Sequence, residues 1–235
     1  MSEQSIQYGN TIIKFQLDFA NRKTLGIQVH PDKSVKVIAP EGSALKKIKE
    51  KVQKKASWIL RQQDFFLSFH PLTPPRKYVS GETHLYLGRQ YRLKIHKRTS
   101  QCVRLSGGYF HVYAKNPENK DVVKRILKAW YKMKADYHFH NLLEEKAHLA
   151  EKLYGKKPDL VYRWMDKRWG SCDKNGRIHL NLELIKAPKK CIEYVIVHEL
   201  CHLKYLNHSP AFFELLSEVY PNWEATKDRL ERLMV

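Results

Sequence analysis

The pattern His-Glu-Leu-Cys-His at residues 198–202 constrains the fold of this chain more than any other feature of its sequence. Residues four positions apart lie one turn apart on the same face of an α-helix, so the two imidazoles can bind one metal ion. Glu199 would lie beside them, where a carboxylate can take a proton from a metal-bound water. The apolar run at residues 194–197 suits a helix buried against a sheet. The pattern therefore predicts a buried metal-binding helix in an α+β fold.

A catalytic metal site of this type needs a third protein ligand, and three residues compete for that role. His208 lies ten residues after His198, and Asn207 before it tolerates the left-handed backbone of a helix end. This places His208 at a sharp corner, free to point back toward the metal. Glu214 and Glu218, on the helix expected next, are the alternatives. We predict His208 as the third ligand.

The remaining sequence divides into a β-rich part and a mainly helical part. Residues 1–117 alternate apolar and polar positions in short runs, which predicts strands, and they include a Lys-rich helix at about 43–69. A second long helix is expected over about 119–154, with a candidate break at 137–141. We expect two domains, a basic β-rich N-terminal region at 1–117 and a metal-hydrolase domain at 118–235. The second would contain the long helix, a small sheet, the metal-binding helix and the C-terminal helices.

Charge is distributed unevenly along the chain. The formal net charge is +19, yet residues 158–235 hold 12 Lys and Arg against 11 Asp and Glu. Residues 1–157 therefore carry the other 31 basic and 13 acidic side chains, a field that attracts polyanions and acidic proteins. A solvated basic surface is the alternative explanation. The lysines of the first helix are too dense for one helical face, so any nucleic acid would bind diffusely. They are Lys46, Lys47, Lys49, Lys51, Lys54 and Lys55.

The basic region contains a weak internal repeat. A strand pair, a proline and a basic helix with a tryptophan occur around Pro40 and Trp58, and again around Pro117 and Trp130. This pattern is a candidate duplication.

Residues around the metal pattern resemble those of a known family. The shared positions are 168–172 (Arg-Trp-Gly-Ser-Cys), Gly176, Ile178, Leu180, Asn181, 194–202, 207–209 (Asn-His-Ser), Phe213, Pro221 and Trp223. They look like the YgjP-like metallopeptidase domain, which is related to the SprT-like zincin proteases. The resemblance is closest over about 160–233. It implies a zincin-like catalytic domain with His198, His202 and His208 as ligands and Glu199 as the catalytic residue.

Four residues near the pattern are candidates for substrate binding: Arg168, Trp169, Ser171 and His179. A strand just before the metal-binding helix can border the cleft and pair with an extended peptide. Arg168 could hold a carboxylate or a phosphate, and Trp169 could form a pocket wall. An Arg–acid pair and a core tryptophan are the structural alternative. His179 alternates with Ile178 and Leu180, so it faces away from them, toward the expected cleft.

The sequence favours a zinc-dependent metallopeptidase in which Glu199 activates the metal-bound water, with nickel or cobalt as substitute metals. A nucleotide phosphoanhydride hydrolase, or pyrophosphatase, is the second hypothesis. The chain has no Gly-rich phosphate-binding loop, which counts against it. A third hypothesis is a nucleic-acid-associated protease guided by the basic region.

The sequence also bears on location. No apolar run approaches the roughly 20 residues that span a bilayer, and residues 1–10 are polar. The four cysteines form no Cys-x-x-Cys pair, so we expect free thiols in a reducing compartment. These features predict a cytoplasmic protein with no membrane partner.

Overall fold

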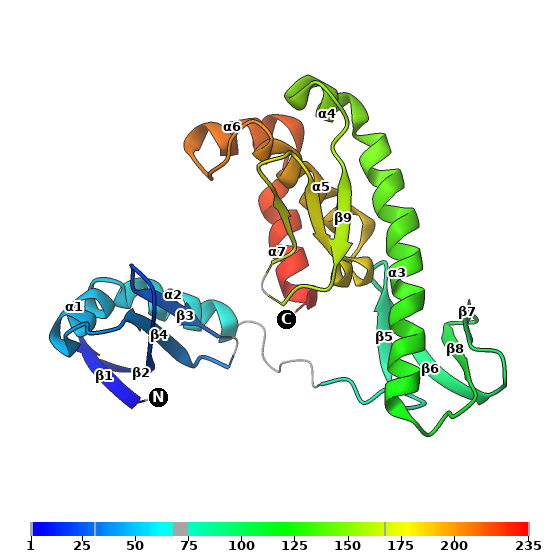
Figure 1. Cartoon of the computed structure of the whole chain (residues 1–235), viewed down its shortest axis with the longest axis horizontal. Coiled ribbons are helices and arrows are strands. Elements are labelled where there is room, and N and C mark those ends of the chain that lie inside the picture. The colour runs from blue at the N-terminus through cyan, green and yellow to red at the C-terminus, as the bar shows by residue number, and fades with distance from the viewer. Residues whose placement is uncertain (1, 31, 68–74, 167, 235) are drawn as a thin grey trace. The chain divides into compact units, whose positions relative to one another are not determined.

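The computed structural model describes residues 2–30, 32–67, 75–166 and 168–234. The chain divides into two compact units, the first ending at residue 74 and the second covering residues 75–234 (Figure 1). Within the described ranges the fold is α+β, with seven α-helices and three small mixed sheets. No helix in these ranges is long and apolar enough to cross a membrane. All four cysteines are free, as predicted.

The first unit is a four-stranded sheet with two helices. Its elements are β1 (Ser2–Tyr8), β2 (Thr11–Ala20), β3 (Gly26–Val29), β4 (Val35–Pro40), α1 (Leu45–Lys54) and α2 (Ala56–Leu67). Successive side chains on a strand point to opposite faces of the sheet, so Phe15 and Leu17 of β2 are buried while Gln16 between them is exposed. Ile48 and Val52 of α1 belong to the same buried core. Apolar alternation in the strands thus defines one covered face.

The second unit begins with another four-stranded sheet, which a long helix covers on one face. Its elements are β5 (Thr83–Tyr86), β6 (Arg89–Lys97), β7 (Cys102–Ser106), β8 (Tyr109–Ala114) and α3 (Lys120–Glu145). The side chain of Asn119 caps α3 by accepting hydrogen bonds from the backbone N–H groups of Asp121 and Val122. Phe110 of β8 meets Trp130 of α3 edge to face, with ring centroids 5.1 Å apart. This contact joins the sheet to the helix.

The two four-stranded sheets have the same topology. Their strand orders are β1-β2-β4-β3 and β5-β6-β8-β7. In each sheet the central pair is parallel and both outer pairs are antiparallel. A helix follows each sheet and packs against it. The structure therefore agrees with the weak internal repeat predicted from the sequence.

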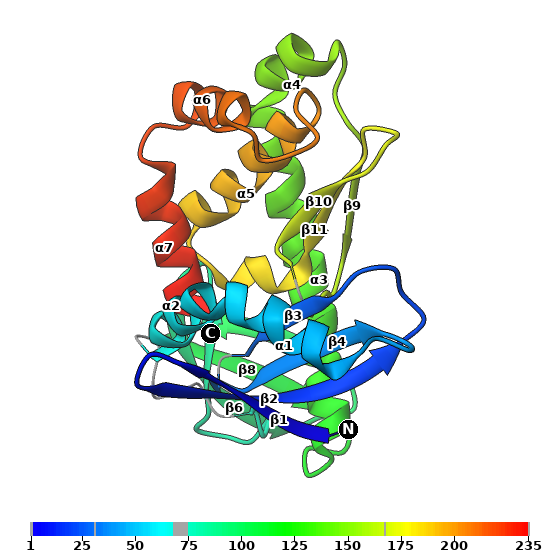
Figure 2. The same ribbon diagram turned by 90° about the vertical axis from the view of Figure 1, so that its left-hand side faces the viewer.

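The rest of the second unit carries the predicted metal site. Its elements are α4 (Ala147–Tyr154), β9 (Leu160–Arg163), β10 (Gly170–Cys172), β11 (Ile178–Asn181), the 3-10 helix η1 (Leu182–Lys186), α5 (Lys189–His202), α6 (Pro210–Val219) and α7 (Trp223–Met234). Figure 2 shows α5 with the small sheet β10-β11-β9 on one side and α6 and α7 on the other. Ile196, Val197 and Leu200 of α5 are fully buried, so the helix that carries the metal pattern is held on several sides.

Three expectations about the elements differ from the structure. The helix predicted at 43–69 is two helices, because the chain turns at Lys55 between α1 and α2, and residues 68–69 lie outside the described part. The break predicted at 137–141 is wrong: the helix continues there because Phe139 is fully buried, and it is interrupted at Lys146 instead. β1 lies in a polar stretch that the sequence did not mark as a strand.

The division of the chain also differs from the predicted boundary at 117/118. That position falls inside the second unit, between β8 and α3. The two elements belong together because Phe110 and Val112 of β8 share one core with Val123 and Leu127 of α3. Both units contain a sheet and helices, and the metal pattern belongs to the second.

We expect Phe110→Ala to lower the free energy of unfolding by about 3–5 kcal/mol, because it removes a buried ring and leaves a cavity. Ile12→Ala, at a side chain that is 60% exposed on β2, should change it by less than about 0.5 kcal/mol. Denaturant unfolding of the full chain measures both. Equal effects of the two variants would contradict the assigned core.

Candidate metal centre

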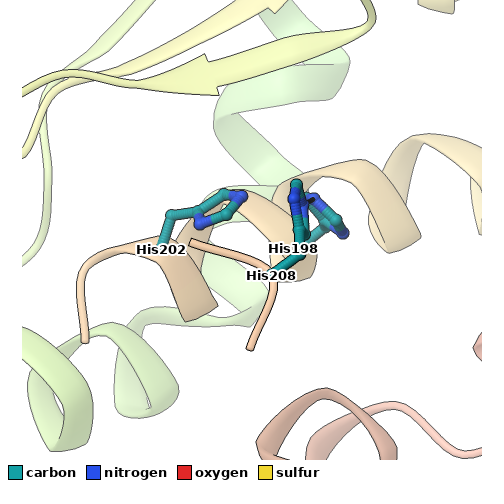
Figure 3. A group of neighbouring side chains, drawn as sticks. All are labelled: His198, His202 and His208. Carbon is teal, nitrogen blue, oxygen red and sulfur yellow. Dashed lines mark hydrogen bonds between the residues drawn. The ribbon is translucent and has the colours of Figure 1, made fainter. Parts of the chain in front are cut away.

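The three predicted histidines meet at the end of α5. His198 and His202 lie one turn apart on the helix, which ends at His202. The chain then turns back, so that His208 comes just before Ser209, the N-cap residue of α6. Figure 3 shows the three imidazoles converging. One nitrogen from each ring lies within 4.8 Å of the other two.

The distances between the rings suit a single shared metal ion. Nε2 of His198 lies 3.0 Å from Nε2 of His208. Two ligand nitrogens of a tetrahedral zinc site, each about 2.0–2.1 Å from the metal, are about 3.4 Å apart. The ring centroids of the three pairs are separated by 5.0, 4.7 and 5.0 Å. Small adjustments of the rings would therefore place three nitrogens around one ion.

The protonation state of the cluster also suits metal binding. Burial lowers the pKa of His198 to about 3, with further contributions from His202 and His208. Burial and the neighbouring His202 also lower the pKa of His208. A metal ligand must be a neutral imidazole with a free lone pair. At neutral pH these two rings are already neutral.

Two neighbours fix the orientation of His202. Its Nδ1–H group donates a hydrogen bond to the carbonyl oxygen of Tyr205, at 2.8 Å. A hydrogen bond at one ring nitrogen fixes the tautomer and leaves Nε2 as the lone-pair donor. The ring of Phe212, which α6 supplies, stacks on His202 at 4.6 Å and lies 5.0 Å from His198 and 4.8 Å from His208. Phe212 is fully buried and forms an apolar floor under the three imidazoles.

Glu199 is one of the few buried charged groups in the described part of the chain. Its side chain lies on α5, and the residue is only 5% exposed. Burial raises the pKa of its carboxyl to about 8, while the nearby Arg168 and a hydrogen bond from the backbone N–H of Cys172 act in the opposite direction. Oε2 of Glu199 is buried and has no hydrogen-bond partner among the described residues. A buried carboxylate oxygen without a partner is costly, so these residues fit a bound cation or water beside Glu199.

Gly170 on β10 allows this arrangement. A Cβ atom at that position would lie 2.6 Å from Oε1 and 2.9 Å from Cγ of Glu199. Any larger residue would therefore displace the carboxylate or the strand. The small sheet and α5 contact each other through this glycine.

The candidate substrate residues lie on or beside β10. Arg168 is exposed, and Trp169 packs half-buried against the core. Ser171 of β10 pairs with His179 of β11 in the sheet register. Nε2 of His179 lies 3.1 Å from Oδ2 of Asp173, so this histidine is engaged by a carboxylate.

The alternative third ligands are placed differently from His208. Glu214 is exposed on α6. Glu218 is also exposed, and one of its oxygens lies 3.8 Å from Nζ of Lys152. Neither belongs to the group of side chains that could share a metal. The geometry therefore favours His208 in this role.

Three features of the site were not found from the sequence: the carbonyl of Tyr205, the ring of Phe212 and the close approach at Gly170. The first is a backbone group and leaves no mark in a sequence. Phe212 lies four residues after His208, so its place on the first turn of α6 was a usable signal. In the sequence Gly170 stands out only through the family resemblance, because its role depends on two elements that meet in space.

Comparisons with known proteins identify one family and two similar solved structures. Residues 23–233 match a protein family described as YgjP-like, metallopeptidase domain. No curated protein matches the sequence. Two solved structures are similar over part of the chain, the metallopeptidase zymogens abylysin of Pyrococcus abyssi and jannalysin of Methanocaldococcus jannaschii. Abylysin is 26% identical in sequence with a TM-score of 0.34, and the match covers 41% of this chain and 91% of the abylysin chain. Jannalysin is 19% identical with a TM-score of 0.34, and the match covers 40% of this chain and 87% of the jannalysin chain.

We expect the purified protein to bind about one divalent metal ion per chain, the stoichiometry of a single-ion catalytic site. His202→Ala should abolish this binding, because it removes one of three ligands. Glu214→Ala and Glu218→Ala are the controls and should leave the metal content unchanged. Elemental analysis after dialysis measures all four proteins. Undiminished metal in His202→Ala would contradict the assigned ligands.

We expect Gly170→Ala to retain the metal but to lower kcat/KM by about 100-fold, the cost of displacing a reacting group by about 1 Å. The added methyl group would collide with the Glu199 carboxylate. Gly107→Ala, in the turn between β7 and β8, is a control for a costly glycine substitution away from the site. Its φ of +55° strains an alanine, but nothing lies within 4 Å of the added carbon, so activity should be kept. Full activity in Gly170→Ala would show that the position of Glu199 does not matter for the reaction.

Proposed function

The chain belongs to the YgjP-like metallopeptidase domain family, and we propose that its three clustered histidines hold one zinc ion beside Glu199 as the general base. Membership of the family makes it a metal-dependent peptidase. The observation that supports the proposed residues is the convergence of three imidazoles next to a buried carboxylate with an unpartnered oxygen. The helix, small sheet and C-terminal helices around them would then form a zincin-like catalytic domain.

The donor set favours zinc over other common metals. Three imidazoles without a thiolate or a second carboxylate suit zinc, with nickel and cobalt as substitutes. His198, His202 and His208 would hold the ion. When bound, such an ion acts as a Lewis acid that polarises the scissile carbonyl and lowers the pKa of a water molecule.

The role proposed for Glu199 is proton transfer at its free oxygen. Oε2 is the oxygen without a partner, so it can accept a proton from the attacking water and deliver it to the leaving nitrogen. Without a metal, burial raises the pKa of this carboxyl to about 8. A cation bound beside it would lower that pKa, so that the carboxylate is ionised and can accept a proton. The Cys172 N–H group and the bare backbone at Gly170 hold the carboxylate in place.

The edge strand β10 is the proposed binding site for the peptide substrate. It lies at one end of the sheet order β10-β11-β9, so its outer edge carries no strand within the described residues. An extended peptide can add to such an edge through main-chain hydrogen bonds. Arg168 is exposed two residues before this strand and is close enough to favour ionised Glu199. It could also pair with an acidic group of the substrate.

Two further hypotheses are a nucleotide pyrophosphatase and a protease guided by nucleic acid. A nucleotide pyrophosphatase would use the same histidines and Glu199, and only a direct assay separates it from a peptidase. A protease guided by nucleic acid would use the basic first unit. There, α1 and α2 border a cavity of about 460 Å³ lined by Lys51, Lys54, Lys55 and Trp58 among others, a combination of cations and an aromatic ring that suits a nucleic acid.

The test of the proposed function is a hydrolysis screen of zinc-loaded protein against an unstructured protein and the four nucleoside triphosphates. We expect cleavage of the unstructured protein. Glu199→Gln should keep its metal and its fold but lose activity by about two to four orders of magnitude, the range for removal of a general base. Glu214→Gln, an exposed glutamate on α6, is the matched control.

Peptide hydrolysis that survives Glu199→Gln would show that another group is the base. Hydrolysis of triphosphates without cleavage of protein would instead support the pyrophosphatase. Each outcome assigns the reaction to a different chemistry.

A further inference from the structure

The sheet β5-β6-β8-β7 has a second face, opposite to the one that α3 covers. Along β8, Phe110, Val112 and Ala114 are fully buried, while the residues between them are partly exposed. Because side chains alternate along a strand, Tyr109, His111 and Tyr113 all point to this second face. We call it the aromatic face.

The strands on either side add cations to the aromatic face. Arg92 and Lys94 of β6 lie opposite Tyr109 and His111 in the sheet register. Arg104 of β7 lies opposite His111 on the other side. These three cations are exposed. The whole segment 83–115 contains seven Lys and Arg residues and no Asp or Glu.

The side chains of the aromatic face form a stacked array. His96 of β6 lies 5.2 Å from the ring of His111 at 17° and 4.9 Å from the ring of Tyr113 at 22°. Nε2 of His96 is also 3.0 Å from Nδ1 of His111. These contacts orient the rings before any ligand binds, which lowers the entropy that binding must overcome.

Two cations at this face lie over its rings. Nζ of Lys94 lies 3.7 Å above the ring of Tyr109, and the guanidinium of Arg98 lies 5.6 Å from the ring of Tyr113. Among the described residues, Lys94, Arg92, Arg98 and Arg104 form no ion pair with an acidic side chain. Positive charge on this face is therefore available to an external anion.

The sheet of the first unit provides an internal comparison. It has the same strand order and the same sense of pairing. Its corresponding face is mixed in charge, with Lys36 paired to Asp18 at 2.8 Å and Lys14 close to Glu3 at 3.8 Å. The topology alone thus does not require an acid-free aromatic face in the second unit.

We propose that the aromatic face of β6, β8 and β7 binds single-stranded nucleic acid. Tyr109 and Tyr113 are four residues apart on β8, about 13 Å and nearly four times the stacking distance of bases, so each can take a base that has left its neighbours. Lys94, Arg92 and Arg104 would contact the phosphates between them. A duplex keeps its bases stacked inside and could use only the charges. This binding site shares no residue with the metal centre or with the lysines of α1.

The test is a binding measurement with the full chain and a labelled 15-nucleotide single strand, by fluorescence anisotropy at two salt concentrations. We expect Tyr109→Leu combined with Tyr113→Leu to weaken binding at least about tenfold, because two stacking contacts are lost. Arg92→Gln combined with Lys94→Gln should weaken it and reduce the dependence of log K on log salt by about 0.7 for each lost phosphate contact. This second variant leaves the rings in place.

Matched controls lie on α3, away from the aromatic face. Tyr137, which is 62% exposed, and the exposed Lys132 should tolerate Tyr137→Leu and Lys132→Gln with less than about a twofold change. Circular dichroism and peptidase activity show whether each variant is folded. The proposal fails if no single strand binds at low salt, or if the same sequence as a duplex binds equally tightly. It also fails if the tyrosine variant binds normally while changing Lys46, Lys47, Lys49, Lys51, Lys54 and Lys55 to glutamine abolishes binding.

Discussion

The burial of Glu199 is the constraint on which the rest of the second unit depends. An ionised carboxylate removed from water costs several kcal/mol unless other groups compensate for the lost hydration. Here one backbone N–H group donates to it, and its second oxygen is left without a partner in the described chain. A divalent cation held by the neighbouring imidazoles would supply the missing compensation. It would also favour the ionised form, which is the form that acts as a base.

The surrounding elements keep that carboxylate and the three imidazoles together. α5 is held between the small sheet and the C-terminal helices, so its ligands cannot move independently. Phe212 limits the space beneath the rings, and the Tyr205 carbonyl sets the tautomer of His202. Precise placement of this kind is what the proposed metal site requires.

Much of this could be predicted from the sequence, because the relevant signals are local. The spacing of His198 and His202 indicates a helical metal site, and the α+β class follows from the pattern of apolar residues. What escaped prediction depends on contacts between distant segments. Gly170 matters only because β10 meets Glu199, and the helix passes through residue 139 only because Phe139 reaches a core built from other elements. The two sheets share a topology that their sequences show only faintly, since their outer faces carry different residues.

The central claim is that one metal ion lies among His198, His202 and His208, beside Glu199. Anomalous diffraction from zinc-loaded crystals tests it most directly. The account predicts one strong peak at the zinc edge, about 2.0–2.1 Å from Nε2 of His202 and from one nitrogen of each other histidine. Bonding to His202 through Nε2 follows from the hydrogen bond that occupies its Nδ1. A peak elsewhere, or one coordinated by Glu218 with His208 turned away, would contradict the account.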